Sequence, residues 1–135
     1  MNINELYIYA KKQNIDVDYF PMKELTSFSM PGCIAIDVDK IENTADEAVH
    51  LAHELGHCVK GAFYNTYSGI DIKSRHEYKA DKWAVQKLIP FDELMSAVDK
   101  GITTTWELAE HFNVTEKFIQ RAIYIYQRIE KIKLI

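Results

Sequence analysis

The sequence predicts an α+β fold in which a small antiparallel sheet packs on two helices and a further helical section follows. Three observations point to it. Short runs rich in β-branched and aromatic residues are confined to residues 16–38. Two segments with apolar residues at helical spacing follow, at about 44–61 and 74–89. A chain of 135 residues, 47% hydrophobic and 27% charged, has the size and composition of one globular domain.

The first part of the chain supplies one helix and the strands. Residues 3–13 have apolar residues at helical spacing and predict a short amphipathic helix. Residues 16–20 alternate polar and apolar side chains before a proline, and residues 25–30 fit a second strand. A Pro-Gly turn then leads into residues 33–38, the most strand-like run of the chain. We expect these pieces to pair as a small antiparallel sheet.

The next helix has clear start and stop signals. Thr44 followed by Glu47 fits a capping box, and Gly61 can end the helix in a left-handed conformation. One face carries an apolar stripe for packing on the sheet, made of Ala48, Leu51, Ala52, Leu55 and Val59. The other face carries three histidines, His50, His53 and His57.

The rest of the chain is predicted to be helical after an aromatic-rich loop at 62–73. Ser74 opens a helix that Pro90 terminates. Three more helices are expected, at 91–100, at 105–112 after a capping threonine, and from Thr115 to the C-terminus. We therefore divide the chain into a core at 1–90 and a helical section at 91–135 that packs on it, as one compact unit.

Charge and composition exclude several classes of function. A net charge of -4 argues against direct binding of nucleic acid, which usually needs a basic surface. The first residues lack the pattern of a secretory signal, and no uncharged apolar run approaches the ~20 residues that span a bilayer. Cys33 and Cys58 are too few for a disulfide scaffold. These features predict a cytoplasmic protein with reduced thiols and no membrane contact.

The stretch His53-Glu54-Leu55-Gly56-His57 carries the strongest functional signal. Histidines four apart on a helix point off the same face, about one turn from each other. In zinc hydrolases with this HExxH pattern, the two histidines bind the metal and the glutamate takes the proton of a bound water. The pattern predicts His53 and His57 as zinc ligands and Glu54 as the general base.

A catalytic zinc site needs a third protein ligand and one open position. The metzincin pattern requires a further histidine at position 63, and Phe63 excludes it. Glu77, 20 residues after His57, follows on the next helix and supplies a carboxylate. Asp81 lies one turn further on the same face, where it could accept the ring N–H of a ligand histidine.

Other interpretations of these residues stay open from sequence alone. The histidines could be ordinary residues on a helix surface. Glu77 could be the second half of a capping box with Ser74, and its neighbour His76 could replace it as a ligand. His50 lies too far along the helix to share one ion with His57, so we expect it at the surface or at the rim of a substrate site.

The two motifs together resemble a known family. The runs LAHELGHCVKGAFYN and HEYKADKWAVQKLIP are similar to the ImmA/IrrE metallopeptidases of bacteria and prophages, in which an HExxH helix is followed by an E-x-x-A-D/N helix. The resemblance covers about residues 33–90. It implies a minimal zincin-like fold, one Zn2+ per chain held by His53, His57 and Glu77, Glu54 as base, and Asp81 orienting a ligand histidine, His53.

The resemblance also implies a substrate. Members of this family are endopeptidases that cleave helix-turn-helix repressors of phages, mobile elements or stress responses, so that cleavage relieves repression. A further hydrogen-bond donor usually holds the oxyanion in such a reaction. The sequence offers four candidates and does not choose among Tyr64, Tyr67, His76 and Tyr78.

The C-terminal section allows a rival function. Residues 103–125 have the rhythm of a helix-turn-helix, which predicts a DNA-binding or protein-binding regulator with a structural metal or an inactive site. Against it, the second helix offers Lys117, Gln120 and Arg121 among many apolar residues, and the chain is acidic. We favour a helical pair that packs on the core or on a partner. A third hypothesis is a metal-binding pseudo-enzyme, against which the intact Glu54 argues.

Overall fold

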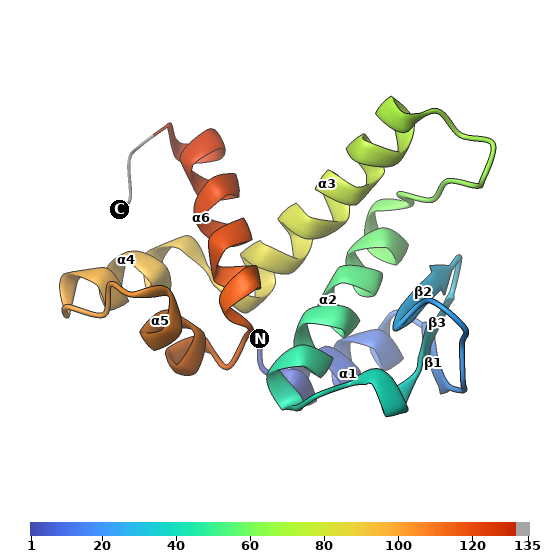
Figure 1. The fold of residues 1–135 in the computed structure, drawn as a ribbon, viewed down its shortest axis with the longest axis horizontal. Helices are drawn as coiled ribbons and strands as arrows, with labels where there is room; N and C mark the ends of the chain where they lie inside the picture. The colour runs from blue at the N-terminus through green and yellow to red at the C-terminus, as the bar shows by residue number, and fades with distance from the viewer. Residues whose placement is uncertain (132–135) are drawn as a thin grey trace.

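The computed structural model describes residues 1–131, and Figure 1 shows how its elements are arranged. The helices are α1 (Ile3–Lys12), α2 (Thr44–Lys60), α3 (Ile70–Leu88), α4 (Phe91–Asp99), α5 (Thr105–Phe112) and α6 (Glu116–Glu130). The strands are β1 (Asp16–Tyr19), β2 (Ser27–Met30) and β3 (Cys33–Ile36), with a short 3-10 helix, η1 (Val38–Lys40), after β3. The predicted α+β class is confirmed. The last residues of the predicted C-terminal helix, 132–135, lie outside the described residues.

The sheet is mixed, not wholly antiparallel as predicted. Its strand order is β1-β3-β2, with β2 antiparallel to β3 and β1 parallel to it. The tight turn at Gly32, whose φ of +77° suits glycine, folds β3 back on β2. β1 therefore pairs with the free side of β3, along which it runs in the same direction. Strand order depends on contacts distant in sequence, and the alternation of residues within a strand carries no such information.

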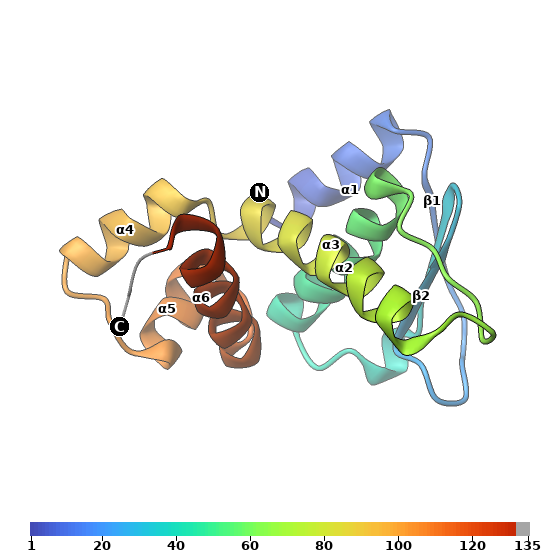
Figure 2. The same cartoon turned by 90° about the horizontal axis from the view of Figure 1, so that it is seen from above.

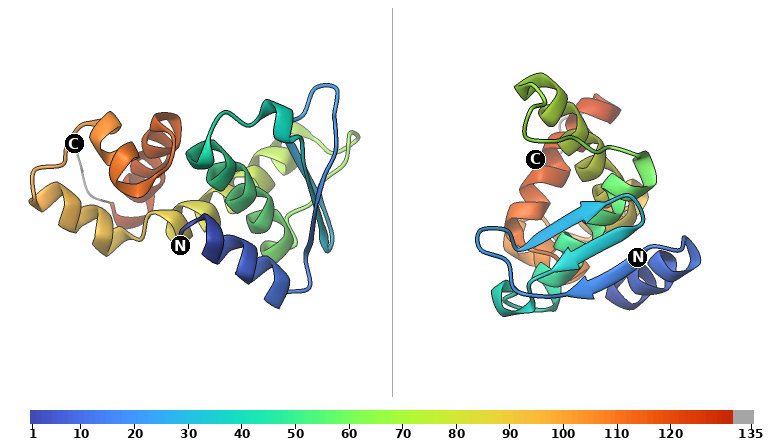
Figure 3. Two further views of the ribbon diagram at one scale, coloured as in Figure 1. Left: turned by 90° about the horizontal axis from the view of Figure 1, so that it is seen from below. Right: turned by 90° about the vertical axis from the view of Figure 1, so that its right-hand side faces the viewer.

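Helix α2 connects the sheet to the rest of the molecule. Ile34 and Ile36 of the central strand are fully buried, as is Leu51 of α2. Helix α2 packs on one face of the sheet with α1 beside it, and the other face carries no helix among the described elements (Figure 3). Helix α3 packs along α2, and α6 packs on α3 (Figure 2). The predicted apolar stripe of α2 is buried except for Val59, which is 38% exposed.

The starts of α2 and α3 differ from the predicted ones. The side chain of Asn43, not Thr44, caps α2 by accepting the N–H of Asp46 at 2.8 Å. Gly61 ends α2 in the left-handed conformation, as predicted. Helix α3 begins at Ile70, so Ser74 lies inside it and cannot form a capping box with the glutamate three residues later.

The C-terminal helices begin where the threonines predict. The hydroxyl of Thr104 caps α5 and that of Thr115 caps α6. The buried hydroxyl of Tyr126 in α6 donates to the carbonyl of Ile89 at 2.6 Å, which ties α6 to the end of α3. None of the helices in the described part of the chain has the length and apolar character needed to cross a membrane.

Candidate metal centre

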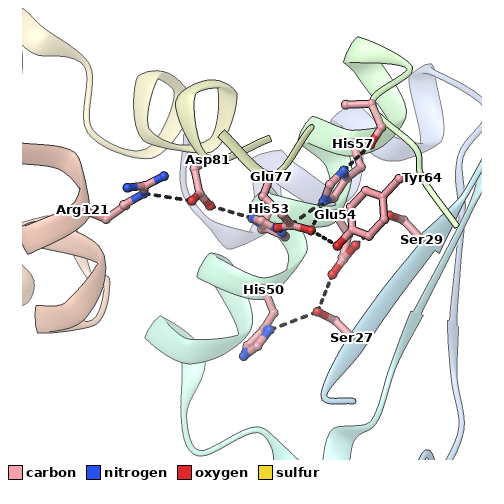
Figure 4. Close-up of polar contacts among 11 residues, drawn as sticks. Ser27, Ser29, His50, His53, Glu54, His57, Tyr64, Glu77, Asp81 and Arg121 are labelled. Carbon is pink, nitrogen blue, oxygen red and sulfur yellow. Dashed lines mark hydrogen bonds and ion pairs between the residues drawn. The ribbon is translucent and has the colours of Figure 1, made fainter. Parts of the chain in front are cut away.

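Three side chains from two helices converge at one point. His53 and His57 lie one turn apart on α2, and their Nε2 atoms are 3.2 Å from each other. Glu77 reaches them from α3, with Oε2 2.8 Å from His53 Nε2 and Oε1 3.3 Å from His57 Nε2 (Figure 4). One donor atom from each residue lies within 4.8 Å of the other two. Glu77, not its neighbour His76, therefore meets the histidines.

The other ring nitrogen of each histidine has its own partner. His53 Nδ1 lies 2.7 Å from Asp81 Oδ1, and His57 Nδ1 lies 2.5 Å from the carbonyl oxygen of Ala62. Carboxylate and carbonyl oxygens only accept hydrogen bonds, so both Nδ1 atoms carry hydrogen. Nε2 is therefore the nitrogen of each ring that would coordinate a metal ion at the point where the three side chains meet.

This donor set fits a divalent metal ion. When a metal ion binds, two neutral imidazoles and one carboxylate each offer it a lone pair. Without a metal ion, the neighbouring carboxylates favour protonation of His53. Burial disfavours the charged form of His53, but hydrogen bonds to Asp81 and Glu77 outweigh it and raise the pKa of His53 to about 10. Two histidines and one glutamate are a ligand set of catalytic zinc sites.

The carboxylate of Glu77 is held in its ionised form. Partial burial opposes ionisation, but hydrogen bonds from His53, His57 and Tyr64 keep the pKa of Glu77 well below its ordinary value. Tyr64 donates its hydroxyl to Glu77 Oε1 at 2.6 Å. That hydrogen bond and burial raise the pKa of Tyr64 to about 12, so its phenol stays a donor at neutral pH.

Two serines that sequence reasoning missed hold Glu54. Ser27 donates to Glu54 Oε2 and Ser29 to Oε1, each at 2.7 Å, and the Glu54 carboxylate is almost fully buried. Ser27 Oγ also lies 3.0 Å from His50 Nδ1, which puts His50 at the rim of the site. The signal for the serines is their spacing of two in a strand, which directs both side chains to the same face. The sequence gives no sign that this face meets Glu54.

The site opens into a cavity of about 480 Å³ between β2, α2, α3 and the loop at 62–69. All five residues predicted for the metal and its chemistry line it: His53, Glu54, His57, Glu77 and Asp81. Apolar walls come from residues on four different segments, including Leu25, Val49, Phe63 and Phe118. A polar, metal-binding floor with apolar walls can hold a peptide segment by its side chains while the polar groups act on its backbone.

The four proposed oxyanion donors differ in position. Tyr64 lines the cavity beside Glu77. Tyr67 is 96% exposed and Tyr78 stacks on two arginines of α6, and neither lines the cavity. His76 stacks on Tyr64, and its buried Nδ1 has no hydrogen-bond partner among the described residues. The geometry favours Tyr64.

Comparison with known protein families decides the class of the protein. The model of the IrrE N-terminal-like domain, a peptidase family, matches residues 3–124 and so extends over nearly the whole chain. The chain belongs to the IrrE N-terminal-like family of metallopeptidases. The match includes the sheet, both motif helices and most of α6, so it extends well beyond the two motifs. Among curated proteins, none matches the chain significantly.

For this IrrE-like metallopeptidase, the structure shows where the cations of the predicted helix-turn-helix lie. Arg121 and Arg128 of α6 lie over the ring of Tyr78 in α3, at 5.8 and 5.2 Å from its centroid. Of the three polar residues that the sequence offered for groove contact, Arg121 is thus engaged with α3, whereas Lys117 and Gln120 are exposed.

Proposed function

We propose that this protein is a zinc-dependent endopeptidase that cleaves a helix-turn-helix repressor of a phage or mobile element. The main support for an enzyme is that His53, His57 and Glu77 lie close together beside the buried carboxylate of Glu54. The family supports a metallopeptidase. The kind of substrate is inferred from the resemblance of the paired motifs to ImmA/IrrE proteins. A substrate of that kind is cytoplasmic, so the proposal assigns the enzyme to the cytoplasm.

In this proposal His53, His57 and Glu77 hold one zinc ion per chain. Zinc with three protein ligands and an open position acts as a Lewis acid that polarises a carbonyl and acidifies a water. Glu54 accepts the proton of the attacking water and passes it to the departing amine. Ser27 and Ser29 hold its carboxylate in one orientation for both transfers. Tyr64 is the donor best placed for the oxyanion.

The edge of the sheet supports binding of an extended peptide. The carbonyl of Thr26 accepts the N–H of Asp37, which follows β3. In an antiparallel pair the residues whose backbone groups bond to the neighbouring strand alternate with those whose groups point away from it. The backbone groups of Ser27 and Ser29 therefore point away from β3. No other described strand pairs with that edge of β2, and Ser27 and Ser29 also line the cavity. A substrate strand paired there would run past Glu54, with its side chains against the apolar walls.

The test compares the wild type with Glu54→Gln in the native host. Glutamine keeps the size of the side chain but cannot take up the proton. It can still bond to both serines, with one hydroxyl donating to its oxygen and the other accepting from its amide N–H. We expect the variant to keep its metal and its fold and to lose cleavage. New protein N-termini, identified by mass spectrometry, should then appear only with the wild type and fall in a protein with a helix-turn-helix domain.

Each other result is informative. Equal cleavage by both proteins would remove Glu54 as the base. Cleavage by the wild type alone, but of proteins unrelated to repressors, would keep the endopeptidase and refute the substrate. Metal binding without any new N-terminus would favour the pseudo-enzyme.

A further inference from the structure

The C-terminal helix α6 reaches the candidate metal centre. Helix α6 packs on α3, and its residue Phe118 forms part of the cavity wall. In Figure 4 a row of side chains runs from α6 through α3 to the histidines of α2: Arg121, Asp81 and His53. The helical section is therefore in contact with the residues that orient a metal ligand.

Asp81 is engaged at both of its oxygens. Oδ1 lies 2.7 Å from His53 Nδ1, and Oδ2 accepts the Nε–H of Arg121 at 2.9 Å. The side chain of Asp81 is 23% exposed and that of Arg121 is 37% exposed, so water screens this ion pair only in part. With one oxygen on each partner, the carboxylate cannot rotate without losing a hydrogen bond.

Arg121 is itself held in place by aromatic rings. Its guanidinium lies 5.8 Å from the centroid of Tyr78 and 5.3 Å from that of Tyr124. Arg128, two turns further along α6, lies over the same two rings at 5.2 and 5.7 Å. Of the two arginines, Arg121 bonds to Asp81, whereas Arg128 donates to the hydroxyl of Tyr124 at 3.2 Å. The two therefore share their stacking and differ in their hydrogen-bond partner.

We propose that Arg121 is a positioning residue of the metal centre: it fixes Asp81, which fixes the ring of His53. Without the Nε–H donor, Oδ2 of Asp81 turns to solvent and the carboxylate gains rotational freedom. The ring of His53 then spends less time with Nε2 directed at the other ligands. The charge of Arg121 repels a bound cation, but the intervening Asp81 carboxylate neutralises it, so the loss of orientation dominates. The inference rests on the metal site of the proposed function.

The test measures the dissociation constant of Zn2+ by competition with a coloured chelator. Arg121→Met keeps the aliphatic part of the side chain and removes the Nε–H donor. Arg128→Met is the matched control, because Arg128 lies on the same helix and over the same two rings. We expect Arg121→Met to weaken binding by roughly three- to tenfold, less than the roughly 10–100-fold loss expected for Asp81→Ala, the direct partner. Arg128→Met should bind zinc as the wild type does.

A double variant separates positioning from packing. If Arg121 acts through Asp81, adding Arg121→Met to Asp81→Ala should weaken zinc binding no further. Nuclear magnetic resonance of the zinc-free protein tests the same proposal by measuring how well the His53 ring is held. The hydrogen-bonded Nδ1–H proton of His53 should be visible in the wild type and in Arg128→Met, and should exchange faster with water in Arg121→Met.

Three results would overturn the proposal. These are unchanged zinc affinity in Arg121→Met, an equal loss in Arg128→Met, and a full further loss in the Asp81→Ala background. A wild type that binds no zinc would refute the metal site itself. In that case the exchange rate of the His53 proton still decides whether Arg121 orders the histidine.

Discussion

Gly56 lies directly against Ala80 where α2 and α3 pack together. A Cβ atom added to Gly56 would come 2.6 Å from the carbonyl oxygen of Ala80 and 2.9 Å from its Cα. Ala80 is fully buried. Because these two small residues let the helices approach closely, Glu77 on α3 can reach His53 and His57 on α2.

This contact predicts the effect of Gly56→Ala. Alanine in place of a glycine inside a helix ordinarily stabilises by roughly 0.5–1 kcal/mol. Here the methyl group meets backbone atoms that cannot turn away, so we expect a net destabilisation of about 1–3 kcal/mol. Zinc affinity should fall as well, because the added methyl group pushes α3 away from α2 and so moves Glu77 away from the histidines. Urea unfolding and chelator competition measure the two effects.

Gly69→Ala is the matched control for this prediction. No atom lies within 4 Å of a Cβ built on Gly69, and its φ of -66° is open to alanine. We expect zinc affinity to stay near that of the wild type. Stability should fall by no more than about 1 kcal/mol, because Gly69 caps α3 and alanine is a poorer cap than glycine. A Gly56→Ala protein more stable than the wild type would show that the close approach of the helices is not needed.

The hydrogen bonds from the serines to Glu54 predict a second result. Ser29→Ala leaves Glu54 Oε1 without its donor in a nearly buried position. We expect a loss of about 1–3 kcal/mol in the free energy of unfolding of the zinc-free protein. Zinc content should not change, since Ser29 touches no ligand. Ser74→Ala, at an exposed helical position, should be neutral. Equal stability of the two variants would mean that Glu54 is not held by Ser29.

Asp37 predicts how stability depends on pH. Its carboxylate accepts the N–H of Met22 at 3.0 Å and that of Asp39 at 3.2 Å, and Lys40 lies nearby. The hydrogen bond from Met22 is the main reason that the pKa of Asp37 is lowered. A carboxyl whose pKa is lower in the folded chain than in the unfolded chain stabilises the fold when the pH is above its unfolded pKa. This stabilisation is lost as the pH falls through its folded pKa.

The comparison is between the wild type and Asp37→Asn, both free of zinc. Stability should fall from neutral pH to about pH 3 more steeply in the wild type, so that the two curves converge in acid. Urea unfolding followed by circular dichroism at several pH values checks this. Parallel curves would show that Asp37 has the same pKa in the folded and unfolded chain.

Sequence patterns predicted the parts of the site that lie on one helix or follow a motif. The spacing of His53 and His57 places both on one face of α2, and Gly61 ends that helix as its type predicts. Glu77 and Asp81 are one turn apart on α3 and both lie at the histidines. Helical periodicity is a local property, and a single sequence carries it.

The contacts that could not be predicted from the sequence join segments that only tertiary packing brings together. Ser27 and Ser29 meet Glu54 only because β2 is the edge strand beside α2, and Arg121 meets Asp81 only because α6 packs on α3. The parallel pairing of β1 with β3 has the same origin. The cap of α2 was misassigned by one residue, since Asn43 and Thr44 are both good capping residues.

The central claim is that His53, His57 and Glu77 bind one zinc ion, and elemental analysis of purified protein tests it most directly. Wild type and Glu77→Ala are supplied with zinc, freed of excess metal and checked for folding by circular dichroism. We predict about one zinc ion per wild-type chain and little or none in Glu77→Ala, because zinc would keep only two protein ligands. A folded wild type without zinc, or a Glu77→Ala protein that keeps its full zinc content, would contradict the claim.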